Sequence, residues 1–119
     1  MDEFDCLIVY VPTSDAAALR RGIADAGAGR LGNYAACSFS VEGIGRFTPL
    51  DGAEPAIGRV GAPEEVPETR IEAIYPRKER DAVVRALLAA HPYETPAFMT
   101  FPIDVSRPGR DPAVEQPEG

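Results

Sequence analysis

The run 4–11 (FDCLIVYV) constrains the fold of this chain most strongly, because its apolar side chains point in both directions. β-Branched and aromatic residues dominate the run and Pro12 closes it, which is typical of a β-strand. Side chains alternate along a strand, so both faces of any sheet that contains this run must be covered. One face receives Phe4, Cys6, Ile8 and Tyr10, and the other receives Leu7, Val9 and Val11.

The residues that follow predict alternating helices and strands. Residues 16–26 carry apolar side chains at helical spacing, after possible caps at 13–15, and glycines end this helix. A second amphipathic helix begins after Pro76 and stops at Pro92. We predict further strands at 35–41, 69–75 and 97–103, with 43–47 as a turn and short return strand.

This order of elements indicates an α+β domain with the ferredoxin-like arrangement βαββαβ, an antiparallel sheet with two helices on one face and an elaborated hairpin loop. Two helices cover only one face of the sheet. The first strand is nevertheless apolar on both faces, and in the last strand Met99 and Phe101 oppose Phe98. No other segment is left to cover the second face, so we expect a homo-oligomer.

Composition limits the partners of this chain. Its 119 residues suit one domain, which we place at 1–104, and the Pro-rich stretch 105–119 is predicted to be a disordered tail. The net charge of −7 argues against nucleic acid or an anionic lipid surface as partner. No apolar run is long enough for a membrane span and no signal-peptide pattern is seen, so we expect a cytoplasmic location. Cys6 and Cys37 are expected to stay reduced.

Glycines, aromatics and small polar side chains gather in the segment 27–61, and the string 91–96 (HPYETP) is its expected neighbour in space. Residues 27–32 (GAGRLG) match G-x-G-x-x-G, but they follow a helix rather than a strand, so a dinucleotide site is not indicated. The stretch 43–47 (GIGRF) fits either an anion-binding turn helped by Arg46 or a tight hairpin, and the hairpin is favoured.

Cys37, His91 and Glu94 form a candidate metal site, because thiolate, imidazole and carboxylate together suit Zn or Cu. The alternative is that Cys37 is a small packing side chain and that His91 forms hydrogen bonds at a helix end. The alternative is favoured. A Cys37–His91 nucleophile and base pair lacks a recognisable third member, so no catalytic residue is assigned and an enzyme is not expected.

Three separated segments resemble one known family. They are 27–49 (GAGRLGNYAACSFSVEGIGRFTP), 53–76 (AEPAIGRVGAPEEVPETRIEAIYP) and 89–98 (AAHPYETPAF), and they resemble the CutA-like, PII-like insert domain of the YqfO group of NGG1-interacting-factor-like proteins. The resemblance implies a ferredoxin-like fold and a homotrimer. It also implies a stand-alone version of the insert, without the dinuclear metal centre that the longer proteins carry, because a single histidine cannot supply that centre's ligands.

The resemblance further implies a non-enzymatic module that binds a small ligand or a partner protein at clefts between subunits, near the long loop. A second hypothesis is a divalent-metal-binding protein that uses Cys37 and His91, with Glu94 as the carboxylate. The positions that match the family's segments and would line the ligand cleft are Asn33, Tyr34, Ser38, Glu42, Arg70, Glu72 and Tyr93.

Overall fold

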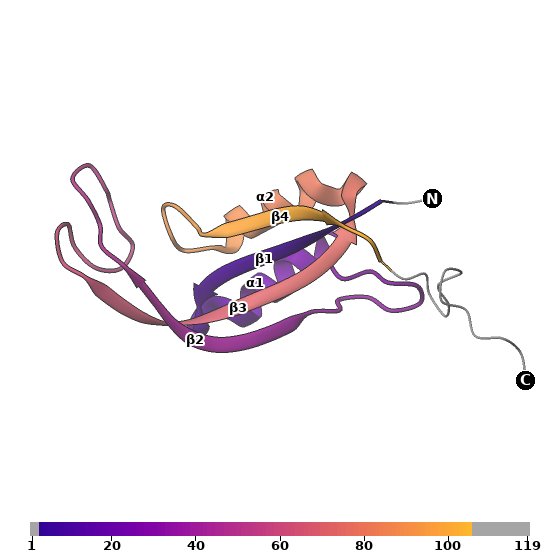
Figure 1. Cartoon of the computed structure of the whole chain (residues 1–119), viewed down its shortest axis with the longest axis horizontal. Coiled ribbons are helices and arrows are strands. Elements are labelled where there is room, and N and C mark those ends of the chain that lie inside the picture. The colour runs from indigo at the N-terminus through magenta and orange to yellow at the C-terminus, as the bar shows by residue number, and fades with distance from the viewer. Residues whose placement is uncertain (1–2, 106–119) are drawn as a thin grey trace, which may run out of the picture.

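The computed structural model describes residues 3–105, which form a four-stranded antiparallel sheet with two helices on one side (Figure 1). The sheet order is β2-β3-β1-β4. The strands are β1 Phe4–Pro12, β2 Phe39–Phe47, β3 Glu64–Pro76 and β4 Phe98–Ile103. The helices are α1 Ala16–Asp25 and α2 Arg80–Ala90, and the 3₁₀ turns Thr13–Asp15 and Arg77–Glu79 precede them. The ferredoxin-like fold is confirmed.

The core lies between the helices and one face of the sheet. Leu7, Val9 and Val11 of β1 are fully buried on this face, as the alternation of the first strand predicts. Strand β3 pairs with β1 and adds Ile71 and Tyr75 to the same layer. The helices complete the core with Leu19, Ile23, Val83 and Leu87.

The opposite face of the sheet, which we call the open face, carries a second apolar layer. One row across the strands consists of Phe39, Glu72, Ile8 and Met99, which pair with one another in register. The side chains of Phe39 and Met99 are 66% and 44% exposed, so this layer is not covered within residues 3–105. The expectation that β1 has an apolar face on both sides is therefore confirmed.

The hairpin between β2 and β3 differs from the prediction. Residues 43–47 were expected to form a turn and a short return strand, but they continue β2, where Gly43 pairs with Glu68 and Phe47 pairs with Glu64. Residues 48–63, which we call the hairpin loop, make the connection instead and extend beyond the helices (Figure 1). Gly43 and Gly45 do not adopt positive φ, so both fit an extended strand.

Three remaining expectations concern the chain as a whole. The predicted tail lies outside the described residues except for residue 105. Neither helix of the described part combines the length and apolar character needed to cross a membrane. Cys6 is half-buried and Cys37 is exposed, and both are free thiols.

Candidate ligand-binding site

His91 fixes the start of the segment that forms one wall of the site. It follows the last turn of α2, and its side chain is buried. Its Nδ1 accepts a hydrogen bond from the backbone N–H of Tyr93 at 3.2 Å. Its Nε2 therefore carries the proton and donates to the carbonyl oxygen of Tyr10 at 2.7 Å. These two bonds attach the segment after α2 to strand β1.

Tyr93 connects this segment to the β2–β3 hairpin. Its hydroxyl donates to Glu68 Oε2 at 2.8 Å, and its ring packs edge-on against Phe47 with the centroids 5.6 Å apart. Gly45 makes room for this pair, because a Cβ there would overlap the Glu68 carboxylate. The predicted proximity of the string 91–96 to the segment 27–61 is therefore confirmed.

The hydroxyl of Tyr93 lies in an environment that disfavours its ionisation. Burial raises the pKa of Tyr93 well above its ordinary value, and the hydrogen bond to the Glu68 carboxylate raises it further. The negative charges of Asp15 and Glu64 act in the same direction. The phenol therefore remains protonated at neutral pH and can act as a hydrogen-bond donor.

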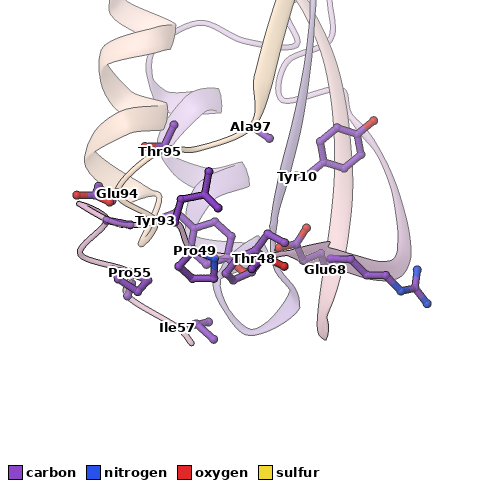
Figure 2. A pocket seen from close by; sticks show the side chains of 15 residues that line it. Tyr10, Thr48, Pro49, Pro55, Ile57, Glu68, Tyr93, Glu94, Thr95 and Ala97 are labelled. Atoms are coloured by element: carbon purple, nitrogen blue, oxygen red, sulfur yellow. Dashed lines mark hydrogen bonds between the residues drawn. The ribbon is translucent and has the colours of Figure 1, made fainter. Parts of the chain in front are cut away.

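A cleft of about 530 Å³ opens beside Tyr93, between the hairpin loop and residues 93–97, and we call it the Tyr93 cleft (Figure 2). Its walls include Phe47, Pro49, Leu50 and Ile57, with polar groups from a few side chains such as Thr48 and Glu68. Apolar walls with a small number of placed polar groups are typical of small-molecule sites, and this volume is within their usual range.

Two of the predicted site residues, Tyr93 and Glu94, line this cleft. Glu94 Oε1 accepts a hydrogen bond from the backbone N–H of Glu54 at 3.1 Å, which ties residues 93–97 to the hairpin loop. Arg70 and Glu72 lie on the open face instead, with Nη2 and Oε1 3.6 Å apart. The remaining predicted residues lie at exposed positions outside the cleft: Asn33, Tyr34 and Ser38 between α1 and β2, and Glu42 on β2.

The predicted metal ligands Cys37, His91 and Glu94 do not meet within one chain. Cys37 lines a separate cleft beside α1, whereas Glu94 lines the Tyr93 cleft. Both ring nitrogens of His91 already form hydrogen bonds. In residues 3–105 no three His, Cys, Asp or Glu side chains are grouped closely enough to hold a metal ion.

Glu68 and Thr48 line the cleft although the sequence did not assign them to it. Glu68 belongs to a charged run at 64–72, which lies in strand β3. The available signal was alternation, because Glu68, Arg70 and Glu72 must share one face of a strand. Arg46, which was considered for an anion-binding turn, pairs with Glu65 at 3.0 Å.

No family model matches this chain. A Mycobacterium leprae protein named GTP cyclohydrolase 1 type 2 homolog is 48% identical over 105 residues, which cover 88% of this chain and 27% of that protein. The solved structure of a Bacillus cereus protein related to NIF3 matches 87% of this chain and 26% of its own, with a TM-score of 0.76 and 40% identity. This chain is homologous to one segment of the NIF3-related proteins. It spans about a quarter of the length of these relatives.

The fold of this chain is also found in shorter proteins. The periplasmic divalent cation tolerance protein CutA from Archaeoglobus fulgidus matches 87% of this chain and 86% of its own, with a TM-score of 0.61 and 15% identity. At this identity the likeness shows the fold alone. This chain therefore has the CutA-like fold that the sequence resemblance implies.

Proposed function

We propose that this chain is a non-enzymatic, homotrimeric module of the CutA and PII type, which binds a small ligand or a partner protein at clefts between its subunits. The observation that carries this proposal is the Tyr93 cleft, because it combines apolar walls with a protonated phenol and a carboxylate. The place of Tyr10 in the sheet supports the proposal that the Tyr93 cleft lies between subunits. Tyr10 lines the cleft and also pairs with Arg70 on the open face, so a copy that covers this face would border the cleft.

The open face supports self-association. Its exposed apolar side chains include Phe39, Val41, Met99 and Phe101, and covering them removes apolar surface from water. Arg70 and Glu72 give the same face charges of both signs, which neighbouring copies can pair across an interface. The two free thiols suit a reducing compartment, and we propose the cytoplasm.

Native mass spectrometry of the chain with a mixture of small metabolites tests this proposal. We expect the mass of three chains, with bound small-molecule mass that is lost in Ala56→Trp, since Ala56 lines the cleft and a larger side chain would fill it. The matched control is Ala17→Trp at an exposed position of α1, which should retain the bound mass. Bound mass that survives Ala56→Trp would place the ligand elsewhere and contradict the assignment.

A further inference from the structure

The Tyr93 cleft has an apolar part that can hold a compact apolar body. The hairpin loop supplies this part through Pro49, Pro55 and Ile57, which Figure 2 shows, and through Leu50. Leu50 is 73% exposed, so an occupant that covers it would remove further apolar surface from water. Prolines at 49 and 55 limit the backbone freedom of this wall, which reduces the entropy lost on binding.

Glu68 gives the cleft an acidic part. One carboxylate oxygen accepts the hydrogen bond from Tyr93 at 2.8 Å, and an ionised carboxylate has acceptor sites for several such bonds. Within residues 3–105 no lysine or arginine forms an ion pair with Glu68. Arg46 also lines the cleft, but its guanidinium pairs with Glu65 at 3.0 Å. Among the residues that the structure describes, the carboxylate of Glu68 therefore has no cationic partner.

Further carboxylates near Glu68 add to its negative charge. Glu94 lines the same cleft, and Asp15 and Glu64 are close enough to act on the phenol that Glu68 binds. Such an arrangement produces a negative potential, which attracts cations and repels phosphates and carboxylates. The cleft is therefore poorly suited to a nucleotide or another anionic ligand.

We propose that the Tyr93 cleft binds a small organic cation, with an apolar body against the hairpin loop and an ammonium or guanidinium group paired with Glu68. This inference names the ligand class of the proposed binding site and rests on that proposal. Charge-assisted hydrogen bonds to a half-buried carboxylate would fix the orientation of the head group. The phenol of Tyr93 holds the carboxylate in place for this contact.

A pair of probes with similar bodies and opposite charges tests the ligand class. We would titrate ¹⁵N-labelled full chain with 2-phenylethylamine and, separately, with 3-phenylpropionate and inorganic phosphate, and follow the backbone amides by NMR. The amine should shift amides in 47–57 and 93–97, whereas the two anions should not. Glu68→Gln should weaken amine binding at least tenfold. The control Glu42→Gln removes the same charge outside the cleft and should leave the affinity unchanged.

Gly45→Ala gives a second test that leaves the net charge unchanged. The new methyl group would displace the Glu68 carboxylate from Tyr93, so amine binding should weaken although every ionisable group is retained. The inference would be overturned if the anions bind in place of the amine, or if Glu68→Gln binds the amine as tightly as the wild type does. If no probe binds while the metabolite mixture still gives bound mass that Ala56→Trp removes, the cation class is wrong and the proposed site stands. If neither the probes nor the metabolite mixture binds, the proposed site itself is wrong.

Discussion

At the scale of single residues, Gly29 shows how closely the backbone packs in the connection between α1 and β2. Its N–H donates to the carbonyl of Ile74 at 2.6 Å, and its own carbonyl accepts from the N–H of Cys37 at 3.0 Å. Its φ is +86°, and a Cβ there would collide with the backbone of Cys37. Backbone atoms in such a ladder cannot move aside as a flexible side chain can.

Gly29→Ala should therefore lower the free energy of unfolding by about 3 kcal/mol, from the combined collision and backbone strain. The matched control is Gly52→Ala, where φ is +95° but no atom lies within 4 Å of the added methyl group. The control should lose only about 1–2 kcal/mol, the cost of the left-handed conformation. Urea denaturation measures both values, and equal losses would contradict the close approach at Gly29.

The raised pKa of Tyr93 predicts a stability change in alkaline solution. Above the ordinary tyrosine value of about 10, the unfolded chain ionises this phenol while the folded chain keeps its proton. The folded state then binds more protons, so its stability falls as pH rises through this region and is fully present below it. The free energy of unfolding should fall more steeply above about pH 10 in the wild type than in Tyr93→Phe. The pKa of Tyr75 is also raised, but Tyr75 contributes equally to both proteins. If the free energy of unfolding falls with pH at the same rate in both proteins, Tyr93 ionises freely and the prediction is wrong.

At the scale of elements, one side chain joins α2, residues 92–97 and β1. The ring nitrogens of His91 pair with backbone groups of Tyr10 and Tyr93, and the N–H of Tyr10 donates to the carbonyl of Ala97 at 3.1 Å. The orientation of the cleft wall thus depends on a hydrogen-bonded histidine. These contacts agree with the alternative that the sequence favoured for His91, which was hydrogen bonding at a helix end.

His91→Ala should lower the free energy of unfolding by about 2–3 kcal/mol, because it leaves a backbone donor and a backbone acceptor without partners. The loss should be the same with and without a metal chelator. Arg85→Ala on the exposed side of the same helix is the control and should change stability by less than about 0.5 kcal/mol. A loss that appears only in the absence of chelator would favour the metal hypothesis instead.

The β2–β3 hairpin shows where glycine patterns mislead. Gly43 and Gly45 suggested a turn because glycine is common where φ is positive, yet both lie in extended pairing with β3. Gly45 instead leaves space for the carboxylate of Glu68. The same residue type serves either purpose, and the sequence alone does not distinguish them.

At the scale of the whole molecule, the proposed assembly depends on the open face. Ile8 lies near its centre, between Glu72 of β3 and Met99 of β4. Ile8→Glu should convert the proposed trimer to a monomer, because a new charge would have to be buried in each copy. Light scattering after size exclusion measures the mass, and circular dichroism checks that the fold is retained.

Ala17→Glu, at an exposed position of α1 on the opposite layer, is the matched control and should remain trimeric. A wild-type monomer would contradict the assembly proposal directly. An Ile8→Glu trimer would show that another surface mediates the association.

The fold was largely predictable, whereas the site was predictable only in part. Alternation in β1 and the helical spacing around Leu19 and Leu87 follow from local periodicity, and both are confirmed. Tyr93 and Glu94 were predicted near the long loop and lie there. Ser38 and Cys37 were predicted in sites with them, but both line a separate cleft beside α1, because short segments of sequence do not specify which distant surfaces meet.

The sequence by itself determined which side chains face each side of the sheet, since that depends only on the two-residue repeat of a strand. It also determined that two helices leave one apolar face uncovered. Only the tertiary structure decided that Glu68 lies against Tyr93 and above Gly45. That contact depends on the register between β2 and β3 and on the path of residues 92–97, both of which are fixed by long-range pairing rather than by local pattern.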